Sequence, residues 1–100
     1  MKSVTVYTTL LVDHDAPVTI DELARCCERQ TEWVVTLVRE GVVSIARGEE
    51  PREWAFGSLA VARARQIARL QRDFDVNLDA AALMIDLMEE VRQLRRRLGS

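Results

Sequence analysis

Apolar residues near the end of this 100-residue chain recur at alternating spacings of four and three. The series is Ala80, Met84, Leu87, Val91, Leu94 and Leu98. Such a repeat predicts a helix with a narrow apolar seam, which is buried by pairing with another helix. We therefore expect a C-terminal coiled-coil helix that forms a homodimer. Its predicted interface consists of Met84, Leu87, Val91, Leu94 and Leu98.

Two shorter helices are predicted upstream by their start signals. Thr19 and Glu22 fit a capping box, and apolar residues follow at helical spacing as far as Cys27. After a polar connector at residues 28–30, Thr31 is the predicted N-cap of a second helix that ends near Gly41. Two short helices joined this closely predict a helix-turn-helix.

The residues after the second helix predict a small β wing. Val42, Val43 and Ile45 are β-branched, residues 54–56 are apolar again, and a tip is expected at residues 46–52. Alternating residues from Val4 to Leu10 predict a further β segment at the N-terminus.

A third helix is expected from about residue 59 to Phe74, capped by Ser58, and Asn77 is the predicted cap of the last helix. The predicted inward side of the third helix consists of Ala60, Ala64, Ile67, Leu70 and Phe74. The expected fold is mainly α, with a winged helix-turn-helix followed by two longer helices. Residues 1–76 would form the winged-helix body, including the N-terminal β segment, and residues 77–100 the coiled-coil helix.

Charge is divided unevenly along the chain. Residues 1–60 carry six Lys or Arg and ten Asp or Glu, a net charge of −4, whereas residues 61–100 carry eight Arg and six Asp or Glu, a net charge of +2. Proteins that bind duplex DNA gather Lys and Arg where they touch phosphate. Because the predicted helix-turn-helix lies in the acidic part, the sequence disfavours nucleic-acid binding. A DNA-binding transcription regulator of the MerR type remains the alternative.

Several segments in order resemble the bacterial chaperone modulators of the CbpM type, within the MerR-like winged-helix superfamily. They are REGVV at residues 39–43, EWAF at 53–56, ARARQIARL at 62–70, FDVNL at 74–78, AAAL at 80–83 and LMEEV at 87–91. The resemblance implies a MerR-like winged-helix fold and a non-enzymatic protein. It further implies a bacterial, cytoplasmic inhibitor that binds the J-domain of a DnaJ-like co-chaperone of the CbpA type.

A J-domain carries a basic helix, so a protein that binds it should present carboxylates. The candidate partner-binding residues are Asp13, Asp15, Asp21, Glu22, Glu28 and Glu32, together with the aromatic Trp33 as an interface anchor. Asp13 and Asp15 lie on the turn before the first predicted helix, and the other carboxylates lie on or beside the first two helices. Glu49 and Glu50 add acidity at the predicted wing tip. For each residue alone, a solvated surface position is the competing interpretation.

No catalytic, cofactor or metal site is predicted. His14 is the single histidine, no glycine-rich phosphate loop appears, and no nucleophile is paired with a base. Cys26 and Cys27 with the distant His14 are too few donors for zinc. The sequence shows no signal peptide and no segment that could span a membrane. The adjacent cysteines point to different helix faces, so we expect no disulfide between them and a cytoplasmic location.

Overall fold

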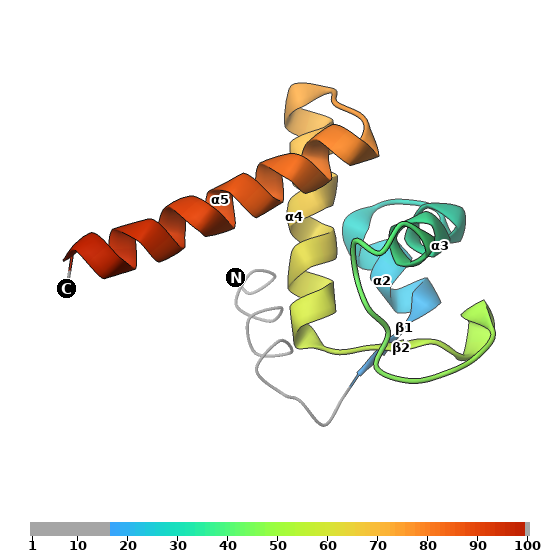
Figure 1. Cartoon of the computed structure of the whole chain (residues 1–100). Helices are drawn as coiled ribbons and strands as arrows, with labels where there is room; N and C mark the ends of the chain where they lie inside the picture. The colour runs from blue at the N-terminus through green and yellow to red at the C-terminus, as the bar shows by residue number, and fades with distance from the viewer. Residues whose placement is uncertain (1–16, 100) are drawn as a thin grey trace, which may run out of the picture. The chain divides into compact units, whose positions relative to one another are not determined.

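The computed structural model of the chain describes residues 17–99 (Figure 1). Its elements, in order, are β1 (Val18–Thr19), α2 (Ile20–Cys27), α3 (Thr31–Arg39), the 3₁₀ helix η1 (Pro51–Glu53), β2 (Ala55–Phe56), α4 (Ser58–Phe74) and α5 (Leu78–Gly99). The predicted mainly helical fold with a small β element is confirmed. The chain divides into two compact units, one ending at Arg65 and the other beginning at Gln66. The division predicted after residue 76 stays a prediction.

Helix α2 begins and ends with well-defined caps. The Thr19 Oγ1 accepts a bond from the Glu22 amide at 3.1 Å, and the Glu22 Oε1 accepts one from the Thr19 amide at 2.8 Å. This confirms the predicted capping box. At the other end Glu28 adopts a left-handed backbone with φ of 59°, and the Arg29 amide donates to the Ala24 carbonyl at 2.9 Å. The left-handed residue ends the helix and starts the turn toward α3.

Helix α3 starts without a side-chain cap. Its N-cap residue is Gln30, whose side chain makes no capping bond, and Thr31 is already the first helical residue. The prediction that Thr31 caps this helix is therefore wrong. The prediction that Ser58 caps α4 is wrong in the same way, because α4 begins at Ser58 itself. The Val61 amide donates to the Gly57 carbonyl at 3.1 Å.

The small sheet joins segments that are distant in the sequence. β1 pairs antiparallel with β2, with Val18 opposite Phe56 and Thr19 opposite Ala55, and an isolated bridge joins Arg47 to Ala55. The wing strand predicted at residues 42–45 is wrong, because the amides of Val42 and Val43 both bond the Leu37 carbonyl and close the end of α3. The N-terminal β segment predicted from Val4 to Leu10 lies outside the described residues.

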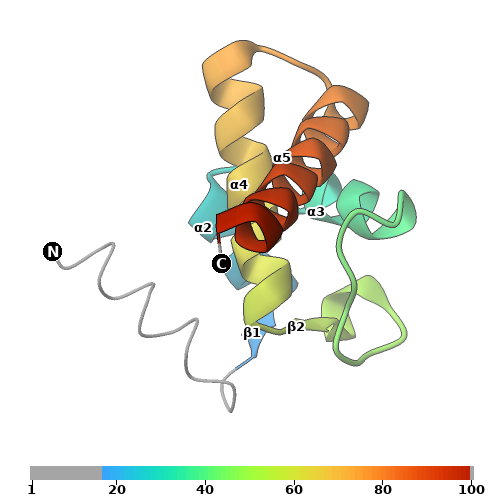
Figure 2. The same cartoon turned by 60° about the vertical axis from the view of Figure 1, so that its left-hand side comes forward.

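The first unit buries one face of α2, α3 and the start of α4 around β2. Figures 1 and 2 show α2 and α3 side by side, joined by the short turn. Among its largest fully buried side chains are Leu23, Val34, Leu37 and Phe56. The Trp54 ring meets Phe56 edge to face, with centroids 6.3 Å apart. Trp54 is thus a core residue, as its apolar surroundings in the sequence indicated.

The second unit contains the end of α4 and all of α5, connected by a turn at residues 75–77 (Figure 2). Its buried residues are Ile67, Ala68, Leu70, Ala81 and Ile85. The Asn77 Oδ1 accepts a bond from the Ala80 amide at 2.8 Å, which confirms Asn77 as the cap of α5.

One residue predicted to face inward on α4 does not. Phe74 is 60% exposed, so that prediction is wrong. The helix stops at Phe74, because the next residue, Asp75, adopts a left-handed backbone with φ of 53°. The ring therefore sits at the end of the element rather than along its buried stripe. Within residues 17–99 no helix combines the length and apolar character needed to cross a bilayer.

Candidate functional site

The helix-turn-helix displays carboxylates on both sides of its turn. Asp21 and Glu22 occupy the first turn of α2, Glu28 lies at its C-cap, and Glu32 lies in the first turn of α3. All four side chains are exposed. We call these four residues the acidic face. Asp13 and Asp15, also predicted for this site, lie outside the described residues.

Three carboxylates of the acidic face are unengaged among the described residues. There the side chains of Asp21, Glu28 and Glu32 make no hydrogen bond or ion pair. Glu22 differs, because one of its carboxylate oxygens is used by the capping box. An incoming cation could therefore pair with Asp21, Glu28 or Glu32 without breaking an existing contact in the described part of the chain.

Trp33 lies beside the turn and is half-buried. The guanidinium carbon of Arg29 sits 5.2 Å from the centroid of the Trp33 ring, within the range of a cation–π contact. The sequence identified Trp33 as a candidate anchor but gave no sign of this contact. The spacing of four between Arg29 and Trp33 is a helical one, yet Arg29 precedes α3 and lies in the turn.

The surface of α3 is poorly equipped to read DNA. Its exposed positions include Glu32, Thr36 and Arg39, and the exposed Glu40 is its C-cap. From Val18 to Phe56 the chain carries five arginines and eight carboxylates, a net charge of −3. A surface that binds phosphates is expected to have the opposite sign.

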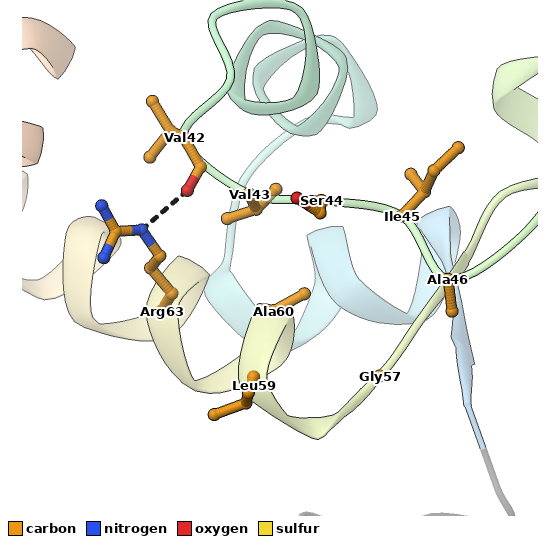
Figure 3. A pocket seen from close by; sticks show the side chains of 9 residues that line it. All are labelled: Val42, Val43, Ser44, Ile45, Ala46, Gly57, Leu59, Ala60 and Arg63. Carbon is orange, nitrogen blue, oxygen red and sulfur yellow. Dashed lines mark hydrogen bonds between the residues drawn. The ribbon is translucent and has the colours of Figure 1, made fainter.

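A shallow hollow with a volume of about 370 Å³ lies between residues 42–46 and the start of α4 (Figure 3). Its lining is largely apolar and includes Val42, Ile45 and Leu59. The polar side chains that line it are those of Ser44 and Arg63, and the Arg63 Nε donates to the Val42 carbonyl at 2.7 Å. Binding sites for small molecules bring several polar groups together. Because this hollow does not, the chemistry of its lining points to no particular ligand.

The two cysteines form no disulfide, as predicted. A hydrogen bond with the Cys26 side chain, together with burial, raises the pKa of the Cys27 thiol above its ordinary value. A thiol held protonated is a weak nucleophile and a weak metal ligand. Among residues 17–99 no three His, Cys, Asp or Glu side chains gather in a way that could hold a metal ion.

The apolar seam of α5 faces outward. Leu87, Val91, Leu94 and Leu98 are 55%, 45%, 50% and 87% exposed, while Met84 is partly covered. The residues that α5 buries are Ala81 and Ile85, on a different stripe of the helix. Every residue from 86 to 99 is exposed. The second half of α5 therefore presents its apolar residues to solvent.

Comparison with known proteins agrees with this architecture. Residues 18–100 match the family model described as MerR HTH family regulatory protein. Chaperone modulatory protein CbpM of Pseudomonas putida (strain W619) is 34% identical over 88 residues, which cover 88% of this chain and 82% of the relative. The chain belongs to the CbpM family of MerR-type helix-turn-helix proteins.

Two further relatives carry the same name. CbpM of Pseudomonas entomophila (strain L48) is 30% identical over 88 residues, with 88% of this chain and 82% of the relative covered. CbpM of Coxiella burnetii (strain Dugway 5J108-111) is 26% identical over 89 residues, with 89% and 83% covered. No solved structure matches the chain.

Proposed function

We propose that this chain is a non-enzymatic chaperone modulator that binds and inhibits the J-domain of a DnaJ-like, CbpA-type co-chaperone. The observation that carries the proposal is the acidic face, in which Asp21, Glu28 and Glu32 are exposed and unengaged among the described residues. The relatives carry the name chaperone modulatory protein, which supports the choice of a chaperone system. Both family descriptions are those of regulators rather than enzymes.

Charge complementarity explains how such a surface would select its partner. The basic helix of a J-domain is the part that docks on its chaperone, and opposite charge speeds encounter and rejects wrong partners. A single exposed ion pair contributes about 0–1 kcal/mol, so affinity must come from several carboxylates together with an anchor such as Trp33. A J-domain whose basic helix is covered in this way cannot dock on its chaperone, and inhibition follows.

The MerR-type fold also makes DNA a competing partner, because relatives of this architecture are regulatory proteins. The negative charge of residues 18–56 argues against it, as do two exposed carboxylates, Glu32 on α3 and Glu40 at its C-cap. Binding to short duplexes at low salt, followed by fluorescence anisotropy, separates the two functions. Tight and sequence-selective DNA binding would contradict the chaperone role.

We further propose that the protein acts as a homodimer joined through α5. A solvent-exposed helical segment as short as residues 86–99 is marginally stable in water, and the seam formed by Leu87, Val91, Leu94 and Leu98 is left uncovered. A second copy of the same helix offers a matching seam.

Charge along α5 favours an antiparallel pair. The acidic residues Asp79, Asp86, Glu89 and Glu90 all precede Val91, and the basic residues Arg92, Arg95, Arg96 and Arg97 all follow it. This order suits the dipole of a single helix. In a parallel dimer, however, it would place like charges together, whereas an antiparallel dimer brings each acidic half beside the basic half of the other copy.

Calorimetry with a purified J-domain from the same organism tests the proposed function. We expect saturable binding that weakens as salt is added. The combined variant Asp21→Asn, Glu28→Gln and Glu32→Gln should bind roughly ten-fold more weakly, since three exposed pairs are lost. The matched control, Asp73→Asn, Asp75→Asn and Asp79→Asn, changes the net charge equally and should bind like wild type. Absence of a complex at tens of micromolar would refute the proposal.

A further inference from the structure

The Trp33 ring holds a cation of its own chain, and it lies next in sequence to Glu32, whose side chain makes no hydrogen bond or ion pair within the described part of the chain. The Arg29 guanidinium carbon is 5.2 Å from the ring centroid, and both side chains are partly exposed. We propose that Trp33 is a receptor for an arginine or lysine side chain of a basic protein partner, and that Arg29 occupies this position until the partner's cation replaces it. The inference rests on the proposed function, because it specifies one contact within that binding surface.

The backbone around the turn holds the ring and Arg29 in place. The Arg29 amide bonds the Ala24 carbonyl at 2.9 Å, and the Trp33 amide bonds the Gln30 carbonyl at 3.0 Å. The turn itself is fixed by the left-handed backbone of Glu28. The ring is therefore presented on a rigid element, and replacement of Arg29 requires only movement of its flexible side chain.

Arg29 is weakly held in its position. Among the described residues its guanidinium pairs with no carboxylate, although Glu28 is adjacent and Glu32 is three residues away. A cation over a partly exposed indole is a weak contact compared with a buried ion pair. A partner's cation gains the same contact and, in addition, carboxylates that Arg29 leaves unpaired.

The charge around Trp33 selects the chemistry of the partner. Residues 20–40 carry three arginines and five carboxylates, a net charge of −2. An acidic or phosphate-bearing partner would be repelled here, whereas a basic helix could place one cation on the ring and others beside Glu28 and Glu32. A tryptophan face is the strongest aromatic receptor for such a group.

The test compares removal of the competing cation with a matched loss of charge. Arg29→Gln removes the guanidinium from the ring, and Arg39→Gln makes the same charge change at an exposed position of α3. Binding of the octa-arginine peptide and of the purified J-domain is measured by calorimetry for each variant of the full chain. We expect Arg29→Gln to bind both ligands about 2- to 5-fold more tightly than Arg39→Gln.

Removal of the ring provides the second arm. Trp33→Leu should weaken binding, and when it is combined with Arg29→Gln, the gain in affinity from Arg29→Gln should disappear. With Trp33→Phe in place of Trp33→Leu, part of that gain should remain. Circular dichroism establishes that each variant is folded. If Trp33→Leu does not fold, Trp33→Phe replaces it as the test variant. Equal affinities of Arg29→Gln and Arg39→Gln, or an unchanged gain without the ring, would overturn the inference.

The two proposals fail in different ways. If the J-domain binds wild type but Arg29→Gln behaves like Arg39→Gln, the proposed function stands and the ring is not the receptor. If the J-domain does not bind but the peptide shows the gain specific to Arg29→Gln, the cation receptor stands and the J-domain is not its partner.

Discussion

Arg63 donates its Nε–H to the carbonyl of Val42, 2.7 Å away and 21 residues earlier in the chain. This bond ties the segment that follows α3 to the beginning of α4 within the first unit (Figure 3). The two residues lie in two of the segments that carry the family resemblance, REGVV and ARARQIARL. Because residues 42–45 are not a strand, the Val42 carbonyl is paired by a side chain instead of a sheet.

Loss of this bond should destabilise the first unit. We expect Arg63→Met to lower the free energy of unfolding by about 1–3 kcal/mol, because a partly buried carbonyl loses a charged donor. Urea denaturation followed by circular dichroism measures the change. The control Arg69→Met, at an exposed position of the same helix, should change stability by less than about 0.5 kcal/mol. Equal effects of the two variants would show that the Arg63 bond contributes nothing.

Gly48 should tolerate no side chain. Its φ is +109°, and a Cβ there would collide with the backbone carbonyl of Glu53. We expect Gly48→Ala to destabilise the protein by more than about 1 kcal/mol, through backbone strain and displacement of the 3₁₀ segment. Gly57→Ala is the control, since a methyl group added there would have no neighbour within 4 Å and its φ is not positive. Thermal denaturation should show a lower Tm for Gly48→Ala alone.

Substitutions in the seam of α5 should separate the proposed dimer. We expect Leu87→Glu or Leu94→Glu to yield a monomer in light scattering, because a buried carboxylate in a coiled-coil seam has no partner. Leu59→Glu changes an equally hydrophobic residue that is 86% exposed but lies outside the seam, and it should leave the mass unchanged. A wild-type protein that is already monomeric at micromolar concentration would contradict the dimer.

Cys27 should resist alkylation. Its pKa is raised, so its thiol remains protonated at and above neutral pH, and the reactive thiolate is scarce. Iodoacetamide at pH 8 followed by tandem mass spectrometry should show slow modification of Cys27 in the native protein and rapid modification in urea. Rapid native modification at Cys27 would mean that the α2 core opens readily.

Sequence patterns predicted the elements whose signals are local. The capping box of Thr19 and Glu22 and the cap at Asn77 were correct, because each depends on residues three positions apart. The N-caps assigned to Thr31 and Ser58 were off by one residue, since both residues are already helical. Boundaries of this kind depend on how the preceding turn is built, which composition does not specify.

The wing and the turn were less predictable because they depend on partners distant in sequence. β-branched residues at 42–45 favour a strand, but the bonds of Val42 and Val43 to the Leu37 carbonyl prevent it, and β2 pairs with β1 instead. In the candidate site, the four carboxylates of the acidic face are exposed, as their positions on the predicted helices indicated. The Arg29 contact with Trp33 was missed, because the sequence does not fix the direction of a side chain that leaves a turn.

The central claim is that the helix-turn-helix binds a basic protein surface rather than DNA. The most direct test is an NMR titration of the isotope-labelled chain with an unlabelled J-domain from the same organism. We expect the largest chemical-shift changes in the amides of residues 21–33, with little change at residues 86–99. Changes confined to α5, or changes in residues 21–33 caused by duplex DNA and not by the J-domain, would contradict the claim.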